Sequence, residues 1–283
     1  MGLKSINHLG VLFTNNGTET YIYVLGIKPE REIIIDKNVT LLPVTPHINP
    51  EDMIDCFMKY GNGSEYQMGM LISTLRSVTA QLRIRSNDAE DLAFKTWNAQ
   101  HICVQISAML NCEIAWYFQA NQSADCFNAH TDISMIHSHV FVVPANIVEL
   151  NETQCEYIEN NISTALVLAE YEKYSNASNA LFCYRLHPKS SIQLSIIWSG
   201  IESLFLFEYN IKNKLALSAS RFICGDDSMV DDIKELYTYR CKAVHEYENQ
   251  DDEILKESVS LLHRLIKKCI EAQSLPNIDQ LLE

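Results

Sequence analysis

The chain has 283 residues, with 36 acidic and 22 basic side chains and a formal net charge of −14. This length fits two compact domains or one large one, and an apolar content of 47% supplies a sizeable core. The negative charge argues against a protein that coats nucleic acid, but not against an enzyme that handles a few nucleotides in a local basic pocket. No apolar run is long enough for a transmembrane helix, so we expect no membrane association.

The cysteines and histidines indicate neither disulfides nor a metal site. Nine cysteines are scattered without a CxxC pair and without a secretory signal, which predicts reduced thiols in a cytoplasmic protein. Cys126, His130, His137 and His139 come closest to a metal-binding set, but no CxxC or HExxH accompanies them. Glycine-rich nucleotide-binding motifs are also absent, so we expect no metal and no cofactor.

The first half of the chain alternates strand and helix patterns. Short β-rich segments are separated by turn signals, and two segments carry helical start signals. We predict strands at 10–14, 20–26, 32–43, 71–86, 113–120 and 139–144, helices at 53–60 and 88–110, and a polar loop at 121–138. This half is therefore predicted to be a mixed α+β domain, residues 1–147, that senses a signal or positions a substrate.

The second half shows the apolar period of helices throughout. Residues 190–209 are apolar nearly all round, which is typical of a central buried helix, and keep one narrow polar stripe that includes Ser199 and Glu202. Helices are predicted at 152–175, 190–209, 211–224, 228–245 and 255–273. Residues 148–283 should therefore form an all-α bundle of four or five helices, and the whole chain should be α+β.

Arg240 is the residue of this bundle that most needs an explanation. It falls in the middle of the apolar side of the helix at 228–245, where a guanidinium costs several kcal/mol unless it is paired or faces a polar cavity. His245 follows five residues later, at the end of the helix. Two structural readings are open: Arg240 forms an ion pair with Glu202 or another buried acid, and His245 caps the helix. The other reading is an active site.

Three segments in the same order resemble a known family. They are YRLHPKSSIQLSIIWSGIESLF at 184–205, LYTYRCKAVHE at 236–246, and the closing helix that ends in CIEAQSLP. Together they resemble the HEPN superfamily, and within it the ApeA-like group associated with bacterial anti-phage defence. The resemblance implies a helical bundle that dimerises so that two R-x4-6-H motifs meet in one cleft, with metal-independent endoribonuclease activity. Arg240 and His245 match the arginine and histidine of that motif.

The chemistry of these two residue types agrees with the resemblance. RNA carries its own nucleophile, the 2′-hydroxyl, and an imidazole with a pKa near neutrality can take or supply the protons of cleavage. A guanidinium can grip phosphate oxygens and stabilise the transition-state charge, so no metal is needed. Two positions depart from the family pattern, since Cys241 replaces a polar residue and Glu246 replaces a glycine. Further residues expected to bind substrate or assist are Cys241, Lys242, Glu202 and Tyr239.

The resulting prediction is a homodimeric endoribonuclease that acts on RNA in anti-phage (abortive infection) defence or as a toxin, with a phage-derived trigger or a regulatory partner. The alternative is a non-catalytic HEPN module for dimerisation and for binding a partner protein or a nucleotide. The acidic charge and Cys241 favour the alternative, whereas the retained arginine and histidine oppose it.

Overall fold

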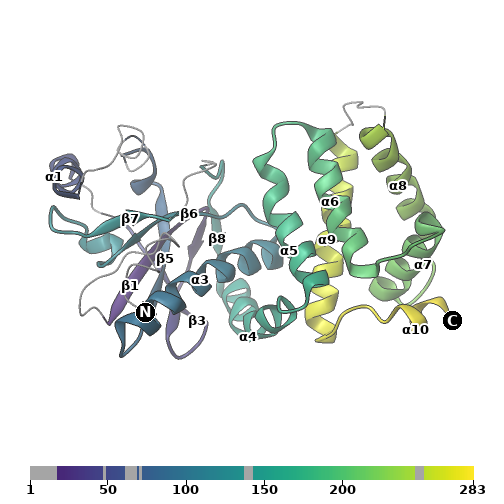
Figure 1. Cartoon of the computed structure of the whole chain (residues 1–283), viewed down its shortest axis with the longest axis horizontal. Helices are drawn as coiled ribbons and strands as arrows, with labels where there is room; N and C mark the ends of the chain where they lie inside the picture. Colours follow the sequence, from purple (N-terminus) through teal and green to yellow (C-terminus); the bar gives the residue numbers. More distant parts are fainter. Residues whose placement is uncertain (1–17, 47–48, 61–68, 70–71, 137–142, 246–251) are drawn as a thin grey trace. The chain divides into compact units, whose positions relative to one another are not determined.

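The computed structural model describes residues 18–46, 49–60, 69, 72–136, 143–245 and 252–283 (Figure 1). The predicted α+β class is confirmed, because an antiparallel sheet is followed by a helical region. The chain forms two compact units, one of Met1–Cys103 with Cys112–Ser163 and one of Val104–Asn111 with Thr164–Glu283. We call them the sheet unit and the helical unit. The division into functional domains at residue 147 stays a prediction.

The sheet unit is built on six antiparallel strands in the order β3-β4-β5-β1-β6-β7. A separate parallel pair joins β2 to β8. The strands are β1 (Glu19–Leu25), β2 (Ile27–Pro29), β3 (Ile33–Ile34), β4 (Val39–Pro43), β5 (Val78–Arg85), β6 (Ala115–Ala120), β7 (Ile133–Met135) and β8 (Val148–Leu150). Since β1 pairs with both β5 and β6, it is a central strand.

Both faces of this sheet are covered, which follows from the burial of β1. Tyr23 and Ile22 point to opposite faces, and each is fully buried. The Tyr23 face packs against the helix α1 (Pro50–Tyr60) in a cluster that includes Met53 and Phe127. The other face lies towards the first part of the helix α3 (Ala89–Leu110), as Figure 1 shows, and the indole nitrogen of Trp116 donates a hydrogen bond to α3 there.

Several strand predictions needed correction. The segment 32–43 is interrupted, because the Asp36 carboxylate accepts the backbone N–H groups of Asn38 and Val39 and turns the chain between β3 and β4. Residues 72–75 are helical, so β5 begins only at Val78. The segment 121–138 was predicted to be loop but contains β7. The predicted strand at 10–14 and residues 139–142 of the strand predicted at 139–144 lie outside the described residues, and residues 143–144 are not in a strand.

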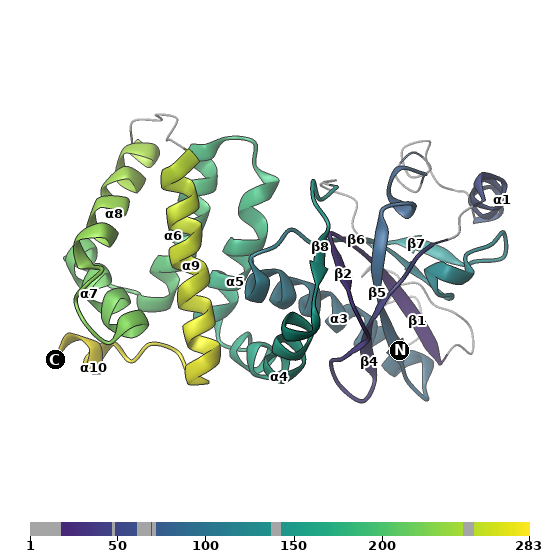
Figure 2. The same ribbon diagram turned by 180° about the vertical axis from the view of Figure 1, so that it is seen from behind.

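The helical unit consists mainly of helices from the second half of the chain (Figure 2). They are α5 (Glu172–Cys183), α6 (Ser190–Phe205), α7 (Ile211–Cys224), α8 (Val230–His245), α9 (Asp252–Ala272) and the short α10 (Ile278–Leu282); α4 (Glu152–Leu168) precedes them. The predicted helix at 152–175 is split at 169–171, and this turn lets α5 bury Tyr174 and Leu181 against α6.

Helix α6 is the central helix of this unit, as its apolar sequence predicts. It packs against α5, α8 and α9, and Trp198 on it is completely buried with its indole N–H donating to Ser258 at 3.1 Å. Gly200 allows the closest approach, since a Cβ at this position would lie 2.6 Å from the Cβ of Ala180 on α5. The helix ends at Phe205 rather than at 209, because Leu206 takes a left-handed conformation (φ 49°).

Candidate functional site around Arg240

Helix α8 turns Arg240 towards the interior of the helical unit. Ile233, Leu236 and Tyr237 are buried at helical spacing, as predicted, and Arg240 follows Tyr237 by three residues on the same side. Only 23% of the Arg240 side chain is exposed. A charged group in this position requires a partner, because its hydration is largely lost.

The partner of Arg240 is Glu202 on α6, so the ion pair that the sequence left as an alternative is present. The Arg240 Nη2 atom lies 3.1 Å from Oε1 and 3.3 Å from Oε2 of Glu202, but only the contact with Oε2 has hydrogen-bond geometry. The Nε of Arg240 is buried and has no hydrogen-bond acceptor among the described residues. The guanidinium is therefore paired through one nitrogen, and its buried N–H donor is left unsatisfied.

Two aromatic rings complete the surroundings of this pair. Tyr237 packs edge-on against Trp198, with ring centroids 5.3 Å apart, and the Arg240 Cζ lies 5.5 Å from the Tyr237 ring centroid. Burial of the Tyr237 hydroxyl and the nearby Glu202 carboxylate raise the pKa of this tyrosine. The ion pair is thus attached to the core of the helical unit through the aromatic pair.

The remaining predicted auxiliary residues of α8 are not gathered around Glu202. Tyr239 lines a groove between α8 and α9, and its hydroxyl lies 3.5 Å from Glu235. Lys242 is exposed, with its ammonium 5.7 Å from the Tyr239 ring centroid. Cys241 is half-buried on the same helix. The structure therefore brings together Arg240 and Glu202, and separately Tyr239 and Lys242.

His245 is the last residue of α8, which agrees with its predicted place at the end of a helix. Its side chain lies outside the described part of the structure, as do residues 246–251. The expected meeting of the His245 imidazole with the Arg240 guanidinium therefore stays a prediction.

A small pocket adjoins the ion pair on the α6–α7 side. It has a volume of about 280 Å³, and Glu202 lines it together with Ser199, Ser203, Leu206, Phe207, Ile211 and Leu215. Ser199 and Glu202 belong to the polar stripe that the sequence predicted on the central helix. A carboxylate, two hydroxyls and an aromatic side chain around one small space suit a ligand that has both polar edges and an apolar face.

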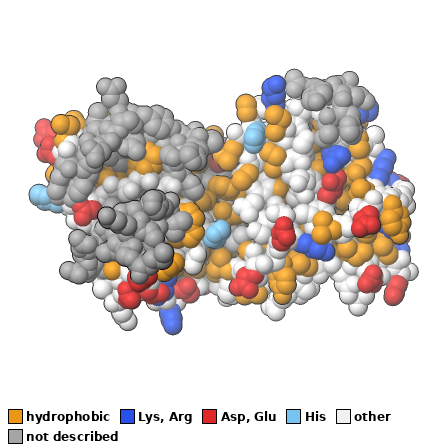
Figure 3. Space-filling model, in the orientation of Figure 1, with side chains coloured by type: hydrophobic (Ala, Val, Ile, Leu, Met, Phe, Trp, Pro, Cys, Tyr) orange, Lys and Arg blue, Asp and Glu red, His pale blue; other side chains and the backbone are white. Residues whose placement is uncertain are grey.

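The groove between α8 and α9 is larger, about 560 Å³, and its rim is mainly acidic. Asp232, Glu235 and Glu257 line it, against the single positive charge of Arg264. On the face drawn in Figure 3, the blue Lys and Arg side chains of the helical part are interspersed with red acidic ones. This groove therefore does not favour a polyanion such as RNA.

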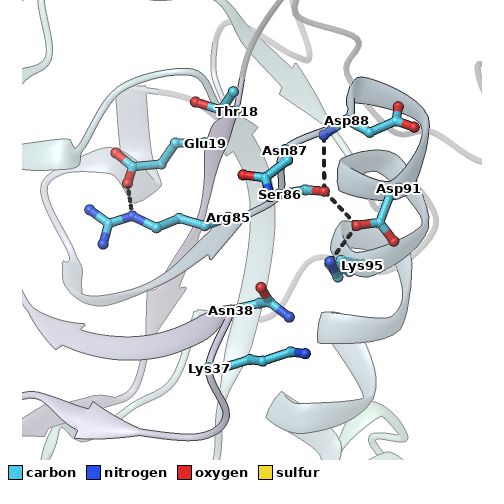
Figure 4. Close-up of a pocket in the computed structure, with 10 residues that line it drawn as sticks. All are labelled: Thr18, Glu19, Lys37, Asn38, Arg85, Ser86, Asn87, Asp88, Asp91 and Lys95. Atoms are coloured by element: carbon cyan, nitrogen blue, oxygen red, sulfur yellow. Dashed lines mark hydrogen bonds and ion pairs between the residues drawn. The ribbon is translucent and has the colours of Figure 1, made fainter.

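A third pocket, of about 540 Å³, lies in the sheet unit near the start of α3 (Figure 4). Its charges are largely paired with one another, because Arg85 bonds to Glu19 and Lys95 bonds to Asp91. The hydrogen bonds from Lys95 and Ser86, with the charge of nearby Lys37, lower the pKa of Asp91. Balanced charges of this kind do not select one class of ligand.

No group of three or more His, Cys, Asp or Glu side chains within the described ranges is arranged to hold a metal ion. Cys126 is exposed at the end of a short 3₁₀ helix (Ala124–Cys126), and His130 is exposed four residues later. His137 and His139 lie outside the described ranges.

Comparison with known proteins found no similarity: no family model matches the chain, and no curated protein or solved structure is detectably similar. None of the helices that the structure describes combines the length and the apolar character needed to cross a bilayer.

Sequence reasoning missed the loop that joins α6 to α7, residues 206–210, because these residues were assigned to the end of the central helix. The loop carries Leu206 and Phe207, which line the pocket beside Glu202, and the exposed Tyr209. A usable signal was present in the sequence, since the apolar run continues into LFEYN, where asparagine and two lysines then follow.

Proposed function

We propose that this chain is a metal-independent endoribonuclease of the HEPN type, in which Arg240 and His245 act at a cleft between two copies of the chain. The observation that carries the proposal is the incomplete satisfaction of Arg240. A purely structural arginine is stabilised by using its donors fully. Among the described residues, Arg240 pairs through a single nitrogen, and its buried Nε has no acceptor. A phosphate has the oxygens to accept from such a group.

The proposed reaction is cleavage of RNA by its own 2′-hydroxyl group, with two imidazoles that transfer the protons. The RNA 2′-hydroxyl loses its proton to an imidazole, and its oxygen attacks the adjacent phosphorus. The bond from phosphorus to the 5′-oxygen breaks, and the leaving oxygen receives a proton from a second imidazole. His245 from each copy of the chain supplies these two imidazoles. Arg240 stabilises the negative charge that builds up on the phosphoryl oxygens. The products are a 2′,3′-cyclic phosphate and a 5′-hydroxyl.

Glu202 has a defined place in this proposal. It holds the Arg240 guanidinium in position in the free protein, and a phosphate must compete with it or share the arginine. A glutamine at position 202 keeps the hydrogen-bonding atoms but removes the negative charge. Glu202→Gln is therefore expected to bind RNA more tightly than wild type, whereas Arg240→Gln is expected to bind it more weakly.

The test is incubation of purified protein with total RNA in the presence of EDTA, followed by mapping of the fragment ends. Wild type is expected to cut at discrete sites and to leave cyclic phosphates. Arg240→Ala and His245→Ala are expected to lose at least 100-fold in rate, a magnitude on the order of that seen when one transition-state donor is removed. Arg240→Lys keeps the charge but loses the planar fork, so it should remain strongly impaired. Full activity of His245→Ala excludes the proposed chemistry.

The second candidate is a non-catalytic module for dimerisation and for binding a partner protein or a nucleotide. The observation that favours it is the same ion pair, because Glu202 neutralises Arg240 within the chain. Expression in growing cells separates the two candidates. Toxicity of wild type that is relieved by Arg240→Ala supports the ribonuclease and a role in abortive anti-phage defence or as a toxin. Equal growth with both proteins supports the module.

A further inference from the structure

The loop between α6 and α7, residues 206–210, exposes apolar side chains beside the Arg240 site. Leu206 is 61% exposed and Tyr209 is 70% exposed, although the last three residues of the preceding helix, Ser203, Leu204 and Phe205, are buried. Exposed apolar and aromatic side chains contribute little burial free energy to folding. Stability of the helical unit alone therefore does not explain them.

The aromatic side chains of this loop are nevertheless held in place. The Phe207 ring stacks on the buried Phe205 ring, with centroids 6.3 Å apart and planes at 9°. The Lys214 ammonium lies 3.5 Å from the Tyr209 ring centroid and 5.8 Å from that of Phe207. Because Lys214 covers one face of Tyr209 while most of the side chain stays exposed, the other ring face is open to solvent.

The charges near the loop are suited to a phosphate backbone. Between residues 206 and 214, two lysines stand against one acid, Glu208. Lys214 carries its ammonium at the edge of the aromatic surface, and Lys212 donates to Thr238 on α8 at 2.7 Å. Since Thr238 precedes Arg240 by two residues, Lys212 links the start of α7 to the helix that carries the arginine. This local excess of positive charge contrasts with the acidic rim of the groove between α8 and α9.

The pocket of about 280 Å³ connects the loop to the ion pair. Leu206 and Phe207 line one side of it, and Glu202, the partner of Arg240, lines another. The pocket thus shares Phe207 with the aromatic surface on which Lys214 lies and shares Glu202 with the ion pair of Arg240. An unpaired nucleotide has a flat base, polar base edges and a charged phosphate, which these groups match in kind.

We propose that the loop 206–210 and Lys214 form a stacking subsite for the unpaired bases of single-stranded RNA next to the scissile linkage. Tyr209 stacks on a base, Lys214 contacts the adjoining phosphate, and the pocket receives the neighbouring nucleotide. The proposal rests on the proposed function, because it places the substrate of that same site. It also assigns the substrate class: single-stranded rather than duplex RNA, since the base faces of a duplex are stacked and inaccessible.

The experiment measures binding of a fluorescent eight-nucleotide single-stranded RNA by anisotropy, with His245→Ala present in every protein so that cleavage of the probe is suppressed while Arg240 stays available to bind phosphate. Adding Tyr209→Ala is expected to weaken binding by roughly 5- to 100-fold, the effect typical of losing one base–aromatic stack. Adding Tyr209→Phe keeps the ring and should change the affinity by less than about 2-fold. Adding Lys214→Gln is expected to lower the slope of log affinity against log salt by about one.

Two controls isolate the loop. Phe94 is a comparably exposed aromatic residue of the sheet unit, 51% exposed, and Phe94→Ala should leave RNA affinity unchanged. Thermal unfolding of each variant checks the fold, which an exposed position such as Tyr209 should not disturb. A duplex of the same sequence should bind more weakly than the single strand, and this difference should disappear in the Tyr209→Ala protein.

The outcomes separate this inference from the proposed function. Equal affinities of the Tyr209→Ala and Tyr209→Phe proteins, or no binding of the probe, overturn the stacking subsite even if wild type cleaves RNA. Binding that depends on Tyr209 supports the subsite. If wild type then fails to cleave RNA, only the proposed ribonuclease activity is contradicted. Association of wild type into dimers that Tyr209→Ala abolishes, without any effect on RNA affinity, assigns the loop to contact with a second copy and also overturns the subsite.

Discussion

Leu206 holds a left-handed backbone conformation while its side chain is largely exposed to solvent. A residue with a Cβ atom pays roughly 1–2 kcal/mol for this conformation, which glycine or asparagine usually occupies at the end of a helix. The left-handed conformation is therefore strained, and the exposed side chain contributes little burial free energy to offset it.

Replacing Leu206 with glycine is therefore expected to stabilise the protein, by about 0.5–1 kcal/mol, because the strain is removed. Leu206→Ala is the matched control, since it shortens the side chain but keeps the Cβ atom and the strain. Chemical denaturation of the two variants and wild type provides the measurement. A glycine variant that is no more stable than the alanine variant argues against backbone strain at this position.

His263 on α9 gives the helical unit a defined pH dependence. Its Nε2 lies 2.9 Å from the Met109 carbonyl oxygen, to which it donates a hydrogen bond. Burial is the main cause that lowers the pKa of His263 below 6.5, and the positive charges of Lys267 and Arg185 act in the same direction. The hydrogen bond to Met109 opposes this shift but does not reverse it. The unfolded chain therefore takes up a proton at higher pH than the folded chain does, and stability is lost as pH falls below about 6.5 towards the folded-state pKa.

The expected result is a steeper loss of stability between pH 7.5 and 5.5 in wild type than in His263→Gln, whose amide can still donate to the Met109 carbonyl. Denaturation midpoints at several pH values measure this difference. His187, an exposed histidine of the same unit, supplies the control, because His187→Gln should keep the wild-type slope. Parallel curves for wild type and His263→Gln contradict the assignment.

Among the helices, the contact of α6 with α5 depends on Gly200. Glycine usually weakens a helix by about 1 kcal/mol relative to alanine, so its presence in a central helix needs a packing reason. That reason is the approach of Ala180, 2.6 Å from the position a Cβ would take, and of Leu262 at 3.1 Å. Position 200 thus sets the distance between three helices.

Gly200→Ala should consequently destabilise the protein by about 1–3 kcal/mol, despite the better helix propensity of alanine, because the neighbouring helices must move apart. Ser199→Ala, one residue earlier and exposed, is the control and should change stability by less than about 0.5 kcal/mol. Thermal unfolding compares the two. A gain in stability on Gly200→Ala shows that the contact with α5 is looser than the structure indicates.

For the whole molecule, the helical unit is discontinuous in sequence, because Val104–Asn111 belongs to it. These residues form hydrogen bonds with the other helices of the unit. Arg185 donates to the Asn111 side chain at 2.9 Å, and Gln105 donates to the Ser178 hydroxyl at 3.3 Å. The Met109 carbonyl adds the contact with His263. A boundary at residue 147 leaves this segment with the other half of the chain.

A fragment of residues 148–283 is accordingly expected to unfold at a lower temperature than the helical unit does in the full chain, with a broader transition. A fragment of residues 104–283 retains the segment and should recover the cooperativity of the transition. Circular dichroism at the helical band measures both. Identical melting of the two fragments means that the segment 104–111 adds no stability to the bundle.

The amino-acid sequence by itself determined the α+β class, most helices of the second half and the inward turn of Arg240, because these follow from apolar periodicity along one segment. It also identified Glu202 as a candidate partner of Arg240, since both interrupt apolar stripes. Only the tertiary structure decided which residues meet, where the central helix ends and that an exposed aromatic loop lies beside the ion pair. Those features depend on backbone conformation at single residues such as Leu206 and on packing between distant segments, to which local patterns are insensitive.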